Sequence, residues 1–293
     1  MALSTTLSHV LMTRFNMATP GREAVIRNHP SWLETRFRLF EEFCLPSVAA
    51  QTSQHFNWII YFDRDTPQVF KDRIKALQAK TQFEAYFTGL FPASGWPDSL
   101  QTVLGPLPAV ILTSRLDNDD ALAVDYMQRT WEVACAQLPT LTRACDTKAD
   151  PSAGRTGIVL TNGFIRADNR AYRLAHPSNA FVSWLERTDD PARLMTAMGI
   201  AHMDAAASGR LVQVSGPGSW LQLVHGGNVS NKVRGQRVGP VALAGRFHAG
   251  ALNGLQPANV LQLSMENSFL APIRKVRDIL IRLTKLVHRR LRG

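Results

Sequence analysis

Residues 109–120 read AVILTSRLDNDD, a short apolar run that ends in three acids and an amide. An unbroken apolar run of this length is typical of a strand whose two faces are both covered, as in a parallel sheet. Ligands of open α/β sheets bind at the carboxyl ends of such strands. The stretch therefore predicts a central strand whose end carries a functional cluster, Asp117-Asn118-Asp119-Asp120.

A second stretch, NWIIYFDRD at residues 57–65, has the same form, a buried strand that ends in acids. Ser8–Phe15 and Phe83–Phe87 predict two further strands. Apolar residues at helical spacing predict helices between them, one of which would begin with an N-cap at Ser31 and a capping box to Glu34. This alternation predicts an α/β fold with a Rossmann-type mixed sheet, mostly parallel and flanked by helices.

The remaining segments give weaker patterns. Gly89–Pro108 is rich in Pro and Gly and predicts a long surface loop, and the polar stretch Thr140–Thr156 predicts another. Strands are expected at Ile158–Ile165, Tyr172–Leu174 and Trp220–Val224, the first two as a hairpin.

The positive charge is concentrated at the end of the sequence. The chain has 293 residues and a formal net charge of +10. From Ile273 onward it has eight Lys and Arg residues and one acid, Asp278, so this segment contributes 8 − 1 = +7 and the rest +3. Apolar residues recur on one face of the same segment. We therefore predict a domain at residues 1–265 and a basic amphipathic helix at residues 266–293.

That composition favours some partners over others. Basic and aromatic residues are not interleaved across the body, so we do not expect nucleic acid as a partner. A basic helix with an apolar stripe suits an anionic membrane surface, although a terminal helix packed on its own domain would look similar. No run approaches the roughly 18 apolar residues of a transmembrane helix, no secretory signal is evident, and the three cysteines are scattered. We expect a cytoplasmic protein, peripheral on the inner face of the cell membrane.

The acid cluster itself predicts a cation site. Carboxylates so close together repel one another unless a cation lies between them, and Mg²⁺ or Mn²⁺ binds one or two carboxylates together with substrate phosphates. The alternative is a solvated acidic turn that caps a helix beginning near Ala121, where Asp120 would be the cap. The preceding strand and the second acidic strand end, at Asp63, favour the functional interpretation.

Several stretches resemble known sequences. Asp117-Asn118-Asp119 is similar to the Asp-x-Asp signature of nucleotide-sugar glycosyltransferases with the GT-A fold, and residues 47–63 resemble another passage of that superfamily. More narrowly, His9–Asn16, Ser114–Asp120, Asn179–Glu186 and Trp220–Asn231 resemble a family of bacterial rhamnosyltransferases. The resemblance implies a GT-A-like, metal-dependent enzyme of polysaccharide biosynthesis. It would move a sugar, rhamnose by the family's label, from a nucleotide-diphosphate donor to a saccharide or lipid-linked acceptor.

The resemblance also implies roles for individual residues. Asp117 and Asp119 would hold Mn²⁺ or Mg²⁺, and His225 would be a third ligand unless it is a structural histidine. The residues expected along the nucleotide sugar are Arg14, Asn16, Asp63, Arg115 and Asn118.

An inverting transferase needs a carboxylate base for the acceptor hydroxyl, whereas a retaining one does not. We consider Glu186 and Asp204 the best candidates for this base.

Two other classes of protein remain open from the sequence. Asp63-Arg64-Asp65-Thr66 after an apolar strand resembles the D-x-D-x-T pattern of haloacid-dehalogenase phosphohydrolases, with Asp63 as nucleophile and Asp65 as general acid. Those enzymes need a lysine before a later acidic motif, and no lysine occurs between Gln82 and Thr147. A non-enzymatic membrane-surface adaptor that uses the basic tail is the second alternative.

Overall fold

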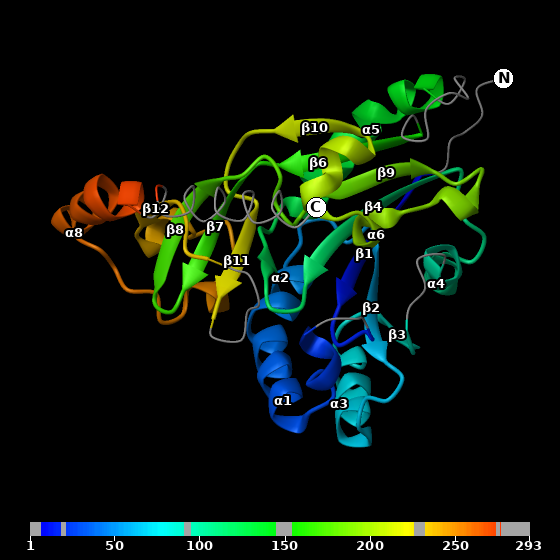
Figure 1. Cartoon of the computed structure of the whole chain (residues 1–293), viewed down its shortest axis with the longest axis horizontal. Coiled ribbons are helices and arrows are strands. Elements are labelled where there is room, and N and C mark those ends of the chain that lie inside the picture. Colours follow the sequence, from blue (N-terminus) through cyan, green and yellow to red (C-terminus); the bar gives the residue numbers. More distant parts are fainter. Residues whose placement is uncertain are drawn as a thin grey trace, which may run out of the picture.

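The computed structural model describes residues 7–18, 22–90, 95–144, 154–225 and 232–273, together with Val276. A seven-stranded sheet in the order β10-β6-β9-β4-β1-β2-β3 forms its centre (Figure 1). The strands β1 to β4 run parallel to one another, as do β6 and β10, and β9 is antiparallel to both neighbours. The predicted mixed, mostly parallel sheet is therefore confirmed. Its strands are β1 (Leu7–Arg14), β2 (Asn57–Asp63), β3 (Glu84–Thr88), β4 (Val110–Asp117), β6 (Arg155–Leu160), β9 (Ser183–Arg187) and β10 (Arg210–Val214).

Helices cover both faces of this sheet. On one face α1 (Pro30–Leu39) and α3 (Gln68–Gln78) pack against β1 and β2, and α5 (Tyr126–Ala144) packs against β4 and β6. On the other face lie α4 (Trp96–Leu104) and α6 (Thr196–Gly199). The remaining helical segments are η1 (Arg22–Val25), η2 (Phe40–Cys44), α2 (Leu45–Ala49), η4 (Pro191–Arg193), η5 (His202–Asp204), α7 (Ala205–Ser208), η6 (Pro240–Ala242), η7 (Ala249–Leu252), α8 (Val260–Met265) and η8 (Glu266–Leu270).

Two local predictions about helices were wrong. The expected surface loop at residues 89–108 contains α4. Trp96 and Leu100 are four residues apart, so they share one face of this helix, and both are buried against the sheet. The expected capping box at Ser31 is absent, since the N-cap of α1 is His29, two residues earlier, with Pro30 in the first turn and no side-chain cap. Proline is favoured in the first turn of a helix because it needs no hydrogen-bond acceptor there.

A second, five-stranded sheet lies beside the first and was predicted only in part. Its order is β12-β8-β7-β11-β5. The expected hairpin is present as β7 and β8, which pair in antiparallel fashion. The single strand expected at Ile158–Ile165 was wrong, because it is divided between β6 of the first sheet and β7 of the second. The short strand β5 directly follows the acid cluster and pairs with β11, so this sheet begins where the first sheet presents its acids. The strands are β5 (Ala121–Leu122), β7 (Asn162–Ala167), β8 (Arg170–Ala175), β11 (Trp220–Val224) and β12 (Gln236–Val238).

The C-terminal part of the described chain is helical. Helix α8 begins at Val260 and continues through the π-helical turn η8 to Ile273, beside β12 and β8 at one edge of the molecule (Figure 1). The predicted boundary between residues 265 and 266 thus falls inside a continuous helix. Most of the predicted basic helix, residues 274–275 and 277–293, lies outside the described residues, so the division into a domain and a tail stays a prediction.

Candidate functional site

The acid cluster forms a tight turn at the end of β4. The Asp120 amide donates to the Asp117 carbonyl at 3.1 Å, and the chain then enters β5. The Asp120 carboxylate accepts a hydrogen bond of 2.8 Å from the Leu223 amide of β11. The expectation of a helix from Ala121 with Asp120 as its cap was wrong, because β5 follows the turn and α5 begins only at Tyr126. Asp120 instead fixes the turn to the second sheet.

Asp119 is the buried centre of the site. Its Oδ2 atom lies 2.7 Å from Arg36 Nη1 and 2.9 Å from His225 Nε2. The Asp119 residue is 5% exposed, and the His225 side chain is 22% exposed. Pairing of β11 with β5 explains why His225, just after β11, reaches the cluster. The structure therefore brings together two of the three predicted metal ligands.

Asp117, the remaining predicted ligand, is bound by an arginine from its own strand. Arg115 Nη2 lies 3.0 and 3.1 Å from the two Asp117 carboxylate oxygens, and Arg115 Nε lies 3.2 Å from one of them. Burial opposes ionisation of Asp117, but the charges of Arg115, Arg14 and Arg36 outweigh it and lower the pKa of this carboxyl below its usual value. Asp117 is therefore an ionised carboxylate at neutral pH.

Asn118 holds the cluster against the first strand. Its amide donates to the Phe15 carbonyl at 3.2 Å, and its Oδ1 atom accepts from Arg36 Nη1 at 3.3 Å. We did not predict Arg36 from the sequence. The available signal was an arginine between Leu33 and Phe37, on the side of α1 that becomes buried.

Asp120 differs from Asp117 in its ionisation. Its burial, together with the like charges of Asp119 and Asp117, raises the pKa of the Asp120 carboxyl well above its usual value. The charges in the turn are thus compensated by Arg14, Arg36 and Arg115 and by this tendency of Asp120 to stay protonated. The repulsion from which we inferred a bound cation is already relieved by the protein itself.

The second acidic strand end is organised around Asp63. Arg27 Nε lies 2.5 Å and Asn28 Nδ2 3.0 Å from Asp63 Oδ2. Burial opposes ionisation of Asp63, but hydrogen bonds from the Asp65 amide, Arg27 and Asn28 outweigh it and lower the pKa of Asp63. Arg27 and Asn28 were missed because they lie in the loop before α1, where no sequence pattern marks them.

Two further predicted residues lie at the end of β1, between these acidic ends. Arg14 is in register with Asp117 of β4 and Tyr61 of β2. Asn16 donates to Thr66 and Asn28, at 3.0 and 2.9 Å, and accepts from the Asp63 amide at 3.2 Å. Residues predicted to bind the nucleotide sugar therefore share the carboxyl edge of three adjacent parallel strands, where ligands of such sheets bind.

The structure does not bring Glu186, one of the two proposed bases, to the cluster. Glu186 is in register with Ile111, six residues before Asp117 on β4, and so lies toward the opposite edge of the sheet. Its carboxylate accepts from the Met195 and Thr196 amides at 3.1 and 2.8 Å. It faces Arg155 at 3.5 Å. We therefore withdraw Glu186 as a candidate base, because these contacts hold the start of α6.

Asp204, the other proposed base, is exposed in η5. The neighbouring His202 lies within electrostatic range of Arg115 and Asp117. Burial first, and then the charge of Arg115, lower the pKa of His202 against the opposing effects of Asp117 and Asp204. The segment that carries Asp204 therefore borders the acid cluster.

The residues of the cluster supply the right atoms for a divalent ion. Carboxylate oxygens from Asp117 and Asp119 suit Mg²⁺ or Mn²⁺, and an imidazole suits Mn²⁺. However, Asp117 and Asp119 are engaged by Arg115 and Arg36, and no three His, Cys, Asp or Glu side chains in the described part of the chain are grouped to hold a metal. For Asp117 and Asp119 to bind a cation, Arg115 and Arg36 would have to move away from these carboxylates.

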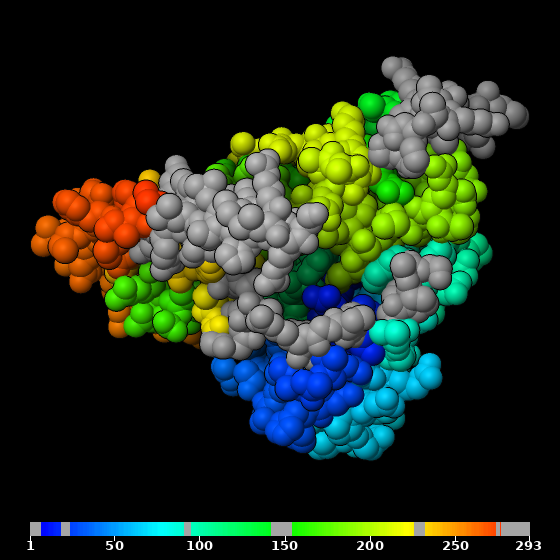
Figure 2. Space-filling view, in the orientation of Figure 1, coloured from blue at the N-terminus to red at the C-terminus, as the bar shows by residue number. Residues whose placement is uncertain are grey.

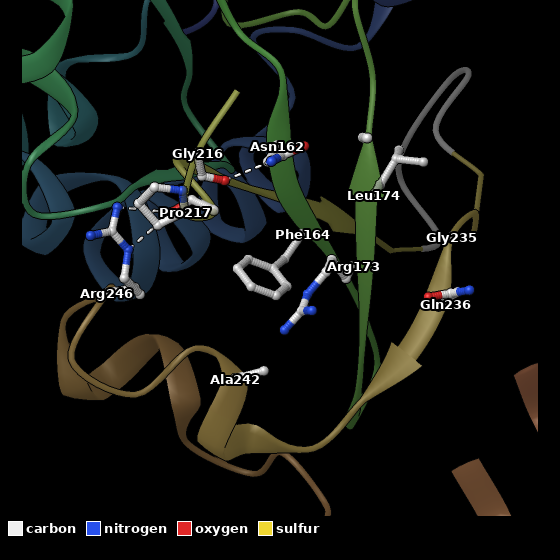
Figure 3. Close-up of a pocket in the computed structure, with 12 residues that line it drawn as sticks. Asn162, Phe164, Arg173, Leu174, Gly216, Pro217, Gly235, Gln236, Ala242 and Arg246 are labelled. Atoms are coloured by element: carbon white, nitrogen blue, oxygen red, sulfur yellow. Dashed lines mark hydrogen bonds between the residues drawn. The ribbon is translucent and has the colours of Figure 1, made fainter. Parts of the chain in front are cut away.

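A cavity of about 630 Å³ lies elsewhere in the molecule (Figure 3). It is lined by β7, β8 and β12 and by the Gly216-Pro217-Gly218 loop, whose Gly216 carbonyl accepts from Asn162 at 2.6 Å. This loop precedes β11, whereas His225 follows β11. The cavity is therefore at the opposite end of that strand from the acid cluster and is not the site described above.

Comparison with known proteins identifies the family. Residues 8–237 match the profile of the family described as "Putative rhamnosyl transferase". The chain belongs to this family. The family that the resemblance predicted is therefore confirmed. No curated protein matches the sequence.

Solved structures similar to this member of the rhamnosyl transferase family include one in complex with the nucleotide sugar UDP-GlcNAc. The structure of S. aureus TarS 1-349 with UDP-GlcNAc has a TM-score of 0.42 and 12% identity, over 89% of this chain and 73% of that one. Another structure of S. aureus TarS 1-349 has a TM-score of 0.38 and 12% identity, over 74% of this chain, which spans 60% of the length of that one. HddC from Yersinia pseudotuberculosis has a TM-score of 0.34 and 8% identity, over 71% and 90% of the two chains.

Proposed function

We propose that this chain moves a sugar from a nucleotide-diphosphate donor to a saccharide or lipid-linked acceptor, with Mn²⁺ or Mg²⁺ at Asp117 and Asp119. The observation that carries the proposal is the convergence of ionised Asp117 with Asp119, Arg14, Arg36 and Arg115 at the carboxyl edge of parallel strands, in a rhamnosyl transferase family member. Rhamnose is the sugar that the family description names.

The arginines of the cluster fit the donor's diphosphate. A guanidinium binds phosphate oxygens through two parallel hydrogen bonds, as the Nε and Nη2 atoms of Arg115 now bind the two Asp117 carboxylate oxygens. Asn16 and Asp63, at the neighbouring strand ends, would contact the nucleoside, and Asn118 would support the turn. A UDP-GlcNAc complex of S. aureus TarS, although only distantly similar, is consistent with a donor of this class.

Transfer requires that the negative charge growing on the departing diphosphate be compensated. A divalent ion held by Asp117, Asp119 and His225 would supply a Lewis acid there. The chain's own arginines can supply part of the same compensation, because Arg36 and Arg115 already face this position. Asp204 is the remaining candidate to accept the proton of an acceptor hydroxyl, if configuration is inverted.

Two other interpretations carry less support. Membership of the family speaks against a phosphohydrolase, and the Asp63 carboxylate is already bound by Arg27 and Asn28. In the described part of the chain no helix is long and apolar enough to cross a membrane. Peripheral association through residues 273–293 stays a prediction, as does an acceptor held on a lipid.

Ligand-induced stabilisation tests the donor and the metal together. We would measure the melting temperature with a panel of nucleotide diphosphates and their sugars, each with Mn²⁺ and with a chelator. A bound ligand at a hundred times its dissociation constant stabilises the native state by about 2.7 kcal/mol. We expect one nucleotide to raise Tm, and Mn²⁺ to increase the shift.

Matched variants make the result specific to the cluster. Asp117→Asn and Asp119→Asn should lose the shift, whereas Asp72→Asn, at an exposed position on α3, should keep it. A shift that is the same in the chelator would remove the metal from the proposal and leave the diphosphate to the arginines. If no nucleotide stabilises the parent protein, the donor proposal is wrong.

A further inference from the structure

The helical segment at residues 260–273 is attached to the molecule by polar side chains. Glu266, in its middle, is 7% exposed and accepts hydrogen bonds from Arg237 of β12 at 2.6 Å and Arg170 of β8 at 3.2 Å. The side chain of Asn267 accepts from the Arg237 amide at 2.7 Å and donates to its carbonyl at 3.1 Å. The inner side of this helix is therefore its polar side.

The apolar side chains of the same segment point outward. Leu261, Met265 and Phe269, which follow one another at intervals of four, are 70%, 58% and 67% exposed. We call the exposed apolar residues of this segment the outer face: Val260, Leu261, Met265, Phe269, Leu270, Ile273 and Val276. A surface helix normally turns such residues toward the core, and a contiguous exposed patch of this kind marks an interaction site.

The outer face lies at the edge of the molecule. Helix α8 is beside β12 and β8, at the end of the second sheet farthest from β5 (Figure 1). In the space-filling view the corresponding orange and red segment projects beyond the rest of the described chain (Figure 2). A broad, flat partner can therefore reach this face without contacting the acid cluster.

The charges around the outer face indicate the chemistry of that partner. Glu266 is the only acid between Val260 and Val276, and its carboxylate is buried against arginines. The sequence from Arg274 to Gly293 has eight Lys and Arg residues and one acid. An apolar face that is followed in the sequence by cations matches the boundary of an anionic bilayer, where acyl chains accept the apolar side chains and lipid phosphates attract the cations.

We propose that the outer face docks on an anionic lipid surface. Leu261, Met265 and Phe269 enter the headgroup boundary, while the basic residues beyond Ile273 contact lipid phosphates. The polar anchors at Glu266 and Asn267 fix the orientation of the helix, so that the domain is held on the surface in one pose. The proposal is independent of the donor site, because none of these residues belongs to it.

Vesicle co-sedimentation of the full chain tests the proposal. Vesicles of phosphatidylcholine alone are compared with vesicles that also contain phosphatidylglycerol. We expect the parent protein to partition at least tenfold more strongly onto the anionic vesicles. The double variant Met265→Asp/Phe269→Asp should reduce that partition at least tenfold, because two carboxylates would have to enter the headgroup region.

A matched control separates the outer face from charge alone. Val69→Asp/Val241→Asp adds the same charge at positions that are 69% and 88% exposed on other elements, and should reduce partition less than twofold. Thermal unfolding by circular dichroism should be alike for all three proteins, since every substituted side chain is exposed.

Three outcomes would overturn the proposal. The first is a parent protein that does not bind anionic vesicles. The second is equal binding by Met265→Asp/Phe269→Asp, which would assign binding to the basic segment without the outer face. The third is a parent that forms dimers by sedimentation velocity, with a monomeric double variant and no vesicle binding by either, which would make the face an interface between copies.

Discussion

Arg36 Nη1 lies 2.7 Å from Asp119 Oδ2, and this ion pair joins α1 to the turn at the end of β4. The two side chains are 10% and 7% exposed, so neither charge can rely on water when the other is removed. Breaking such a buried pair leaves an uncompensated charge, whereas breaking an exposed pair costs little. The pair therefore positions Asp119 and also constrains which substitutions the fold tolerates.

Arg36→Met should destabilise the protein by about 3–5 kcal/mol, because it removes the guanidinium that lies 2.7 Å from the buried Asp119 carboxylate. Arg38→Met is the control two residues away on the same helix. Arg38 is 63% exposed and pairs with Glu42 at 3.3 Å, so its loss should cost less than about 0.5 kcal/mol. Urea unfolding at neutral pH measures both. Equal stability of the two variants would contradict this assignment.

Asp120→Asn should be tolerated, and its benefit should grow with pH. The folded-state pKa of Asp120 is raised, so above the unfolded pKa of about 3.9 the native state holds a proton that the unfolded chain releases. The stability of the parent therefore falls as pH rises toward the folded pKa, and the asparagine variant does not share this loss. An amide oxygen can still accept from Leu223.

The measurement for Asp120 is the difference in unfolding free energy between the variant and the parent from pH 4 upward. This difference should increase in favour of the variant and then become constant. Asp117→Asn should show the opposite trend at lower pH. Because the pKa of Asp117 is lowered in the folded state, the stability that this carboxylate gives the parent is lost as pH falls below about 4, and the variant does not share that loss. A difference that is independent of pH for Asp120→Asn would show that this carboxyl ionises normally in the fold.

The strands that build the sheet were accessible from the sequence because their apolar runs end abruptly in polar residues. Trp58–Phe62 became β2 and the run from Ala109 became β4, each buried on both faces. Strand β9 was missed, although it lies between β4 and β6, because Ser183 and Glu186 interrupt its apolar pattern. Ser183 is satisfied by Ser114 across the pair, and Glu186 by backbone amides, which a sequence pattern does not display.

The site shows the same limit. Asp117, Asp119 and Asp63 were found because acids at strand ends are conspicuous, and His225 was found through the resemblance to the family. Their partners Arg36 and Arg27 come from a helix and a loop that precede them by many residues. Only the packing of α1 against β1 and β2 brings these arginines to the carboxylates, so the charge balance of the cluster could not be derived before the fold.

The burial of His9 predicts that the protein loses stability in mild acid. Its ring is buried, lies 2.8 Å from Ser114 Oγ, and has a pKa lowered by burial to about 3. Between about pH 6.5 and 3 the unfolded chain binds a proton at His9 that the native state does not bind. The free energy of unfolding therefore falls as pH decreases, by about 1.4 kcal/mol per pH unit.

His9→Gln removes this titration. The unfolding free energy of His9→Gln minus that of the parent should therefore rise as pH falls below about 6.5. His55→Gln, at an exposed position, is the matched control. A difference that is flat with pH for His9→Gln would mean that His9 takes up its proton within the native fold.

Gly163→Ala should disturb β11, the strand that His225 directly follows. A Cβ atom at Gly163 of β7 would lie 2.1 Å from the Trp220 ring. Trp220 cannot easily move, because it is 1% exposed, donates to the Leu160 carbonyl at 2.9 Å and stacks on Phe181. Overpacking of this kind typically costs about 1–3 kcal/mol.

The strain at Gly163 has a route to the acid cluster, because Trp220 is the first residue of β11 and His225 follows its last. We therefore expect Gly163→Ala to lower both the unfolding free energy in urea and the Mn²⁺-dependent Tm shift with the stabilising nucleotide. Gly239→Ala is the matched control, since nothing lies within 4 Å of its Cβ position. If Gly163→Ala is as stable as that control, Trp220 and β11 adjust more readily than their contacts indicate, and His225 is not held by this packing.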